Sequence, residues 1–252
     1  MQTLVIDTSY GSTVGVVGHG PIVETDSRTH VEKLQVNIAK AVEQAGLEAS
    51  DITRIVVGIG PAPFTGLRAG IVAAKALAFA TGAQLVGQDV LSPQILAHAG
   101  NTDGRHHLTL AVNDARRRQL YFALYDAAGD ADNPDTLIDM DIDYPDSIAA
   151  RVNAALTRLP DTGRPYAIDI VGHGAAKYAR SWESIDSLGE VDDHVLLDEG
   201  ADGLSHFAAF ATRDQALSKP TPVEPLYLRR PDVSVPNPLK HVLNHAGAER
   251  TE

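Results

Sequence analysis

The sequence predicts an α/β protein of two lobes, each with a mixed sheet flanked by helices. Strand-like and helix-like patterns alternate from residue 3 to residue 99. A polar, glycine-bearing break follows at residues 100–105, and a new strand pattern begins at residues 108–112. We therefore expect a first lobe at residues 1–105, a second lobe at 106–218 and a proline-rich extension at 219–252.

The first lobe is organised around a strand, a loop and a helix between residues 55 and 81. β-Branched residues at the start indicate the strand, and an alanine-rich run to Thr81 indicates the helix. The glycine-bearing loop between them directs backbone N–H groups and the positive end of the helix dipole towards one point, which suits a phosphate. Pro61 and Pro63 have no N–H to donate, which favours a stiff structural turn, and Thr65 is the expected N-cap.

Two short strands at residues 3–6 and 13–17 open the chain, and an Asp-Thr-Ser turn joins them as a hairpin. The hydroxyl groups of this turn could face a phosphate, although such residues are also ordinary in hairpin turns. The candidate phosphate site combines the turn with the later loop. Its residues are Asp7, Thr8, Ser9, Gly60, Thr65 and Gly66.

Two predicted helices carry a second candidate surface. Residues 31–46 place apolar side chains at helical spacing, with Gly46 as the stop. The helix after Gly66 bears mostly glycine and alanine, so another helix can approach it closely. The sequence leaves open whether the two helices pair inside one chain or across an interface. The candidate partner surface comprises Leu34, Ile38, Val42, Leu67, Arg68, Gly70, Ile71 and Ala74.

The second lobe is expected to open with a hairpin of residues 108–112 and 119–125, with Arg116, Arg117 and Arg118 at its tip. Guanidinium groups match phosphate oxygens, which suggests a contact surface. The chain carries 21 basic and 33 acidic side chains, a formal net charge of −12. Its overall field therefore opposes a polyanion, and direct nucleic-acid binding is the less favoured interpretation.

No metal centre or cofactor is predicted. The absence of cysteine excludes disulfides, thiolate zinc sites and cysteine nucleophiles. His30 is followed four residues later by leucine rather than histidine, and the pair His241 and His245 has no third ligand. The glycine turn at residues 172–176 lacks the lysine and hydroxyl of a P-loop, and the sequence shows no partner for His173 within it.

The composition indicates a cytoplasmic protein. Hydrophobic residues make up 44% of the chain and charged residues 21%, which is ordinary for a soluble domain. The first residues have no basic segment and enter a strand directly, and no apolar run is expected to approach the length of a membrane span.

Four stretches taken together resemble the TsaB (YeaZ) family. They are LVIDTS at residues 4–9, VGIGPAPFTGLRAG at 57–70, NDARRRQLY at 113–121 and PLYLR at 225–229. Together they span most of the chain, which makes the combination far more specific than any one stretch. One departure is the pair Ala62 and Pro63, where the family usually has glycine and then serine.

The resemblance implies an actin-like ATPase (ASKHA) fold and a non-catalytic role in tRNA threonylcarbamoyladenosine synthesis. Family members dimerise with the catalytic subunit TsaD and help to recruit the ATPase TsaE; alone, a homodimer is expected. The transfer modifies the adenosine beside the anticodon of tRNAs that read codons beginning with A, and tRNA would reach this chain only through the complex. In the superfamily, an aspartate at the position of Asp7 helps to hold a nucleotide's metal ion, so the phosphate site is expected to be vestigial.

Three alternatives remain open at this point. The first is an actin-like small-molecule kinase or phosphotransferase that uses Asp7, Thr65 and a cleft between the lobes. The second is a metallopeptidase-like protein, for which the sequence offers no convincing set of ligands. The third is a homodimeric binding module without a partner enzyme, which would bury the same small-residue helix.

Overall fold

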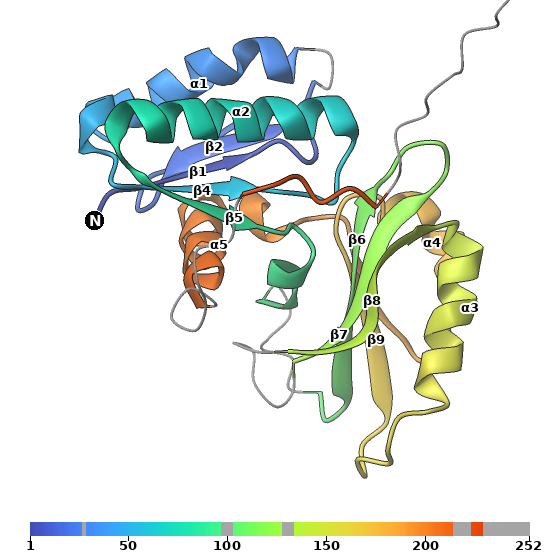
Figure 1. The fold of residues 1–252 in the computed structure, drawn as a ribbon. Coiled ribbons are helices and arrows are strands. Elements are labelled where there is room, and N and C mark those ends of the chain that lie inside the picture. Colours follow the sequence, from blue (N-terminus) through green and yellow to red (C-terminus); the bar gives the residue numbers. More distant parts are fainter. Residues whose placement is uncertain (27–28, 97–102, 128–133, 214–222, 229–252) are drawn as a thin grey trace, which may run out of the picture.

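The structure, a computed structural model, describes residues 1–26, 29–96, 103–127, 134–213 and 223–228, except the side chain of His30. Within these residues the chain forms two five-stranded sheets, each flanked by helices (Figure 1). The strand order is β3-β2-β1-β4-β5 in the first sheet and β10-β9-β6-β7-β8 in the second. The two-lobed α/β fold predicted from the sequence is confirmed.

The first sheet is mixed and almost completely buried at its centre. It contains β1 (Thr3–Asp7), β2 (Ser12–Val16), β3 (Ile22–Glu24), β4 (Arg54–Gly58) and β5 (Gln84–Gln88). β1 runs antiparallel to β2 and parallel to β4, which runs parallel to β5. Because the carboxyl ends of β1 and β4 meet at one edge, the turn after Asp7 lies beside the loop after Gly58.

Two long helices cover one face of the first sheet, α1 (His30–Gln44) and α2 (Phe64–Thr81) (Figure 1). The apolar stripe of α1 packs on the sheet and on α2, as the helical spacing of its apolar residues requires. Gly46 follows α1 with φ +69° and Gly82 follows α2 with φ +74°. Both helices therefore end on left-handed glycines, and the predicted stop at Gly46 is confirmed.

The second sheet combines two parallel and two antiparallel pairings. Its strands are β6 (His106–Asp114), β7 (Leu120–Asp126), β8 (Asp135–Asp143), β9 (Tyr166–Val171) and β10 (Leu188–Asp192), and its helices are α3 (Pro145–Leu156) and α4 (Ala179–Trp182). β6 and β7 form the hairpin predicted from the sequence. β10 was not predicted, because its sequence LGEVD is short and polar. Short 3₁₀ segments are η1 (Ala49–Asp51), η2 (Ser92–Leu96), η3 (Ala176–Tyr178) and η4 (Leu196–Glu199).

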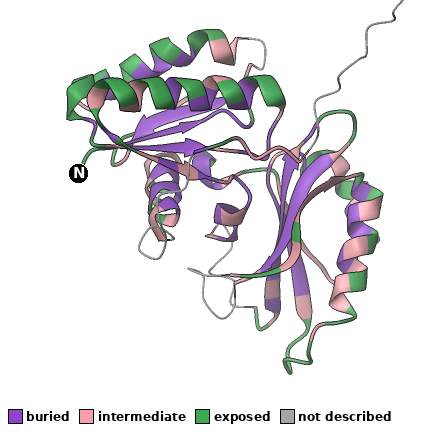
Figure 2. Cartoon of the chain, in the orientation of Figure 1, coloured by how far each residue is buried: buried purple, intermediate pink, exposed green. Residues whose placement is uncertain are grey.

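The last helix, α5 (Gly200–Arg213), returns to the first lobe. Leu204 and Phe207 pack against Val5, Val56 and Val86 on the face of the first sheet opposite α1 and α2 (Figure 1). Figure 2 shows that the central strands of both sheets are buried, whereas the edge strand β8 and the outer faces of the helices are not. The residues at 200–213, predicted as part of the second lobe, thus complete the core of the first.

Residues 223–228, here called the strap, run from the first lobe towards the second (red in Figure 1). Val223 packs in the core of the first lobe, and Leu226 N–H donates to the carbonyl of Ile59 at 2.7 Å. Leu228 packs with a cluster that includes Tyr121 of β7. The strap and α5 therefore join the two lobes, in addition to the chain connection between β5 and β6.

A histidine bridged by two carboxylates lies at the start of β6, away from the lobe boundary. His107 Nδ1 is 2.6 Å from Asp169 Oδ2, and Nε2 is 2.8 Å from Asp103 Oδ1. Burial lowers the pKa of His107, but the hydrogen bonds to Asp103 and Asp169 outweigh it, so the net pKa is raised. Both ring nitrogens then carry protons, and the imidazolium compensates the charge of the buried Asp169.

We expect this bridge to make stability depend on pH. A raised histidine pKa contributes stability that is complete below the unfolded value of about 6.5 and is lost as pH rises through the folded value. Urea unfolding between about pH 6 and 9 should show this loss in the natural chain and a smaller loss in His107→Gln. An identical pH profile in the two proteins would contradict the assignment.

Candidate functional site between the two lobes

Two adjoining cavities lie where the lobes meet, and both are bordered by Ser9 and Tyr10. The larger measures about 180 Å³ and the smaller about 40 Å³. Pockets for drug-sized ligands usually measure about 300–1,000 Å³, so the larger cavity suits a small anion or one part of a larger ligand. The larger cavity is lined by Thr8, Ser9, Tyr10, Gly11, Pro63, Phe64, Thr65, Gly66, Asp114 and Arg116.

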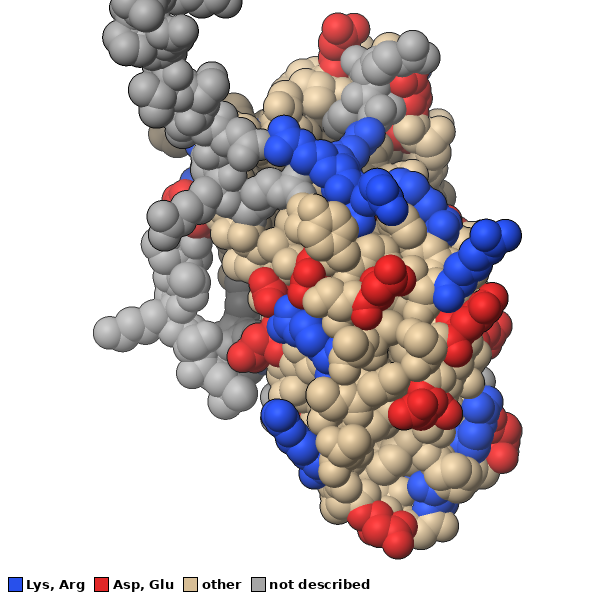
Figure 3. Space-filling view, turned by 90° about the vertical axis from the view of Figure 1, so that its right-hand side faces the viewer, with Lys and Arg blue, Asp and Glu red and all other residues tan. Residues whose placement is uncertain are grey.

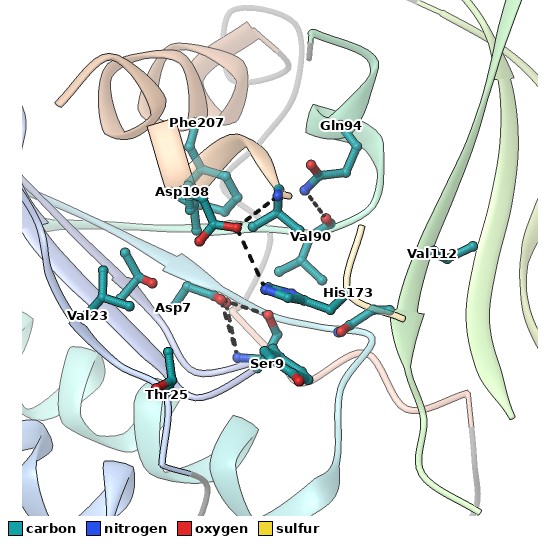
Figure 4. Close-up of a pocket in the computed structure, with 15 residues that line it drawn as sticks. Asp7, Ser9, Val23, Thr25, Val90, Gln94, Val112, His173, Asp198 and Phe207 are labelled. Atoms are coloured by element: carbon teal, nitrogen blue, oxygen red, sulfur yellow. Dashed lines mark hydrogen bonds and ion pairs between the residues drawn. The ribbon is translucent and has the colours of Figure 1, made fainter. Parts of the chain in front are cut away.

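Asp7, at the end of β1, borders the smaller cavity (Figure 4). Its Oδ2 accepts a hydrogen bond from the Ser9 hydroxyl at 2.7 Å and from the Ser9 N–H at 3.3 Å. Burial raises the pKa of Asp7, and the hydrogen bonds from Ser9 and Thr8 only partly oppose it. A Cβ atom on Gly58 would lie 2.0 Å from Asp7 Oδ1, so the carboxyl group requires glycine at the end of β4.

His173 reaches the same cavity from the second lobe (Figure 4). It sits in the turn after β9, stacks on Tyr10 with ring centroids 3.9 Å apart, and places Nε2 3.9 Å from Asp198 Oδ2. Burial lowers the pKa of His173, although Asp198 and Asp193 oppose this shift, so the neutral imidazole is favoured near neutral pH. Neither Tyr10 nor Asp198 was predicted, because no sequence spacing relates them to His173.

The larger cavity lies at the start of α2. The helix begins at Phe64 with Pro63 as N-cap and without a side-chain cap, so Thr65 lies within the first turn rather than at the cap as predicted. The first N–H groups of a helix have no partner inside it, which leaves the Thr65 and Gly66 region suited to an anion. Thr8 Oγ1 is buried beside this turn and has no hydrogen-bond partner among the described residues.

The loop with Ala62 and Pro63 is held from the second lobe. Asn113 Nδ2 donates to the carbonyl of Pro61 at 3.1 Å, and the Tyr121 hydroxyl donates to that of Ala62 at 3.3 Å. Asn113 borders the smaller cavity, and its Oδ1 has no hydrogen-bond partner within the described part of the chain. The loop is therefore a braced turn between the lobes.

Five of the six predicted phosphate-site residues border the two cavities. They are Asp7, Thr8, Ser9, Thr65 and Gly66. Gly60 lines neither cavity; it lies against Leu67 and Leu226 with φ +95°. Within the described residues, no group of three or more His, Cys, Asp or Glu side chains is placed to hold a metal ion. The predictions for the side chain of His30 and for His241 and His245 lie outside the described residues.

Most side chains of the predicted partner surface are buried inside the lobe. Leu34, Ile38, Val42, Leu67, Gly70, Ile71 and Ala74 pack between the helices and the sheet, and Arg68 is exposed. These seven belong to the core because they occupy the inner faces of α1 and α2. A partner could contact only the outer faces, where the exposed apolar residues are Val36, Val72 and Phe79, at 53%, 64% and 93% exposure.

The outer face of α2 exposes large apolar side chains together with two cations, Arg68 and Lys75. The 18 residues of α2 have a mean hydropathy of 1.2 and only 33% of them are buried, so the helix meets the length and composition of a membrane span. This corrects the expectation that no apolar run approaches that length, although a helix packed on a core meets the same criteria. Arg68 Nε donates to the Tyr227 hydroxyl at 2.7 Å, so the strap borders one end of this face.

The family model described as tRNA N6-adenosine threonylcarbamoyltransferase (TsaD) matches residues 14–233. The chain belongs to this family. Uncharacterized protein Rv3421c of Mycobacterium tuberculosis is 34% identical over 241 residues, which cover 91% of this chain and 92% of that protein. The tRNA N6-adenosine threonylcarbamoyltransferase of Pelobacter propionicus is 30% identical over 208 residues, 76% of this chain but only 59% of the enzyme.

Solved structures confirm the fold of this family member. YeaZ from Pseudomonas aeruginosa superposes with a TM-score of 0.60 at 20% identity, and covers 90% of this chain and 99% of its own. A second P. aeruginosa structure, described as similar to peptidase YEAZ, gives a TM-score of 0.64 at 21% identity over the same shares. The chain therefore has the fold and length of YeaZ, as the resemblance to the TsaB (YeaZ) family and its actin-like fold predicted.

We expect Asp7→Asn to stabilise the family member near neutral pH. An acid whose pKa is raised in the folded state stabilises fully below its unfolded value of about 3.9, and this contribution is lost as pH rises through the folded value. Asparagine cannot ionise and can still accept from Ser9, so urea unfolding at pH 7 should give a higher free energy of unfolding than the natural chain. Equal or lower stability of the variant at pH 7 would mean that the hydrogen bonds to Asp7 fully offset the cost of burying its carboxylate.

Proposed function

We propose that this chain is the non-catalytic partner subunit of a TsaD-type threonylcarbamoyltransferase. It binds the catalytic subunit through the outer faces of α1 and α2 and helps to recruit the ATPase TsaE. The assembly transfers threonylcarbamoyl to the adenosine beside the anticodon of tRNAs that read codons beginning with A. In isolation the chain forms a homodimer through the same faces, and it works in the cytoplasm.

The exposed apolar outer face of α2 carries this proposal. Large exposed apolar side chains that share a helix face mark interaction surfaces, and Val72 and Phe79 lie two turns apart on α2. Val36 adds to the apolar surface on the neighbouring α1. The reaction in this proposal is inferred from the family to which the chain belongs. The partner role is favoured by the similarity of the chain to YeaZ in fold and length.

The small volume of the cleft supports a role without turnover. A cavity of about 180 Å³ beside one of about 40 Å³ leaves less room than a complete nucleotide would need. Pro61 and Pro63 deprive the loop of N–H donors, and the loop is braced by Asn113 and Tyr121.

The deciding experiment combines co-purification with a transfer assay. The chain is expressed with TsaD and TsaE from the same source, and threonylcarbamoyl transfer to tRNA is measured with and without it. The proposal expects a stable complex, transfer that depends on the chain, and no turnover by the chain alone. It fails if the chain binds neither protein and the transfer proceeds equally well without it.

One observation favours a phosphotransferase as the alternative. Asp7 and His173, which have opposite pKa shifts, border one cavity, as an acid and base pair would. ATP retained by the free chain, together with phosphorylation of a small molecule that Asp7→Asn abolishes, would favour this alternative.

A further inference from the structure

The tip of the β6–β7 hairpin has an unusual backbone. Arg116, Arg117 and Arg118 have φ of +64°, +52° and +63°, the left-handed region that side chains with a Cβ rarely adopt. The hairpin closes around them, with Gln119 N–H donating to Arg116 O and Ala115 N–H to Gln119 O, both at 3.0 Å. Such conformations persist where the surrounding structure holds them, and they concentrate at functional positions.

Two further exposed cations come from η3 and α4, which follow the turn after β9. Lys177 Nζ pairs with Asp114 Oδ2 at 2.8 Å, which places η3 at the base of the hairpin, and Arg180 follows one turn later on α4. We call Arg116, Arg117, Arg118, Lys177 and Arg180 the basic tip; all five are exposed. Figure 3 shows Lys and Arg side chains gathered over this end of the second lobe. Because the charges of Lys177 and Asp114 offset each other, the arginines carry the excess positive charge of the tip, on a chain whose net charge is −12.

We propose that the basic tip binds backbone phosphates of RNA, and that the RNA is the tRNA on which the assembly acts. The choice of tRNA rests on the proposed function. Direct contact between the basic tip and tRNA differs from the expectation that tRNA reaches this chain only through the complex. Salt at physiological strength screens charges beyond about 8 Å, so acids far from the tip contribute little at the contact. Of the nearer acids, Asp114 pairs with Lys177, and Asp193 accepts hydrogen bonds from the backbone N–H groups of Gly174 and Ala176.

The chemistry of the tip favours phosphate over an acidic protein surface. Protein interfaces use buried apolar or aromatic anchors at their centre. The apolar residues flanking the three arginines, Ala115 and Leu120, are themselves buried, with 1% and 0% exposure. The hairpin itself therefore offers guanidinium forks, which match phosphate oxygens, and no apolar side chain of its own. The nearest exposed aromatic side chains, Tyr10 and Phe64, line the cavity beside Arg116, and the more exposed Val72 and Phe79 lie on the outer face of α2.

The tip is placed so that one assembly could hold both a protein and an RNA. Arg116 lines the larger cavity together with Phe64 and Thr65 at the start of α2. The helix whose outer face binds the partner therefore begins at the cavity that the basic tip borders. RNA bound at the tip would lie beside the partner protein.

The test measures binding of a fluorescent tRNA transcript to the full chain by anisotropy, at salt from about 0.05 to 0.3 M. The first variant carries Arg116→Gly, Arg117→Gly and Arg118→Gly. Glycine adopts positive φ without strain, so this variant should fold and melt at or above the natural temperature. Its affinity for tRNA should fall about 30-fold or more at about 0.1 M salt, and its salt slope by about 2 to 3, if each arginine releases counterions from one phosphate.

Two matched controls separate charge from structure. The triple lysine variant at the same positions keeps the charge and should retain most of the affinity and salt slope. Lys40→Ala with Lys75→Ala removes two exposed cations from α1 and α2, and should leave tRNA affinity within about twofold. If the arginines had only a structural role, the glycine variant would melt at a lower temperature. An unchanged or higher melting temperature with lost tRNA affinity, together with retained affinity in the lysine variant, would instead show that the charge is what binds.

Three results would overturn the proposal. The natural chain could fail to bind tRNA at about 0.05 M salt, or the glycine variant could bind with unchanged affinity and slope. The glycine variant could also lose association with TsaD or TsaE while its tRNA affinity stays unchanged, which would make the tip a protein contact. Tip-dependent tRNA binding by a chain that associates with neither protein would instead contradict the proposed function and leave this inference standing.

Discussion

Replacement of both Val72 and Phe79 by glutamate is expected to abolish association with a TsaD-type partner and to leave the free chain folded. Val72 is 64% exposed and Phe79 93%, so neither replacement removes much core packing. Burying an unpaired carboxylate in an apolar interface costs several kcal/mol, so affinity should fall by about 100-fold or more. Isothermal titration gives the affinity and circular dichroism the melting temperature. The same variant should be monomeric if the free chain dimerises through α2.

Two controls test whether the outer face is the surface concerned. Tyr144→Glu replaces another exposed large side chain, at 55% exposure in the second lobe, and should leave partner affinity unchanged. Gly70→Ala adds a single buried methyl group whose Cβ would lie 2.3 Å from Thr8 Oγ1. It should lower the free energy of unfolding by about 1–3 kcal/mol through overpacking. Normal partner binding by a folded Val72→Glu/Phe79→Glu variant would place the contact elsewhere.

The inner and outer faces of α2 could not be distinguished from the sequence. Glycine and alanine lie all round this helix, and apolar residues occur on the outer face as well as the inner one. The periodicity therefore predicts a helix at these residues but not which face of the helix is buried. Of the seven buried residues chosen for the partner surface, four lie on α2 and three on α1. They were chosen for apolar spacing and small size, which are also the properties of a face that packs on a sheet. By contrast, α1 alternates apolar and charged faces, and its buried stripe follows the predicted residues.

Elements defined by local pattern were predictable, and associations across the chain were not. The sequence predicts a strand, a loop and a helix between residues 55 and 81, and β4 and α2 lie there with α2 ending at Thr81, because β-branched and alanine-rich runs are local signals. The amphipathic pattern of α5 is equally compatible with either sheet, so its return to the first lobe depends on packing. In the site, Asp7 lay at a predictable strand end, whereas the stacking of Tyr10 on His173 joins distant segments.

Replacement of Trp182 by alanine is expected to cause one of the largest losses of stability. Trp182 is fully buried in the core of the second lobe, and its Nε1 donates to the carbonyl of Ala175 at 2.8 Å. Truncation leaves a cavity and removes one of the two hydrogen bonds that the Ala175 carbonyl accepts, the other coming from Tyr178 N–H at 3.3 Å. The free energy of unfolding should therefore fall by about 3–5 kcal/mol, mostly through the cavity. Trp182→Phe keeps most of the volume and should cost about 1–3 kcal/mol. Urea unfolding followed by circular dichroism measures both, and a loss below about 1 kcal/mol in the alanine variant would contradict the burial.

The natural chain contains one tryptophan, so its fluorescence reports the second lobe alone. The helix α5 follows the second sheet in sequence but packs on the first, and the strap contacts both lobes. Unfolding of one lobe therefore removes contacts from the other, and we expect one cooperative transition. Tryptophan fluorescence and circular dichroism should give the same urea midpoint, and Gly70→Ala in the first lobe should shift both. Two separate midpoints would show that the lobes unfold independently despite α5 and the strap.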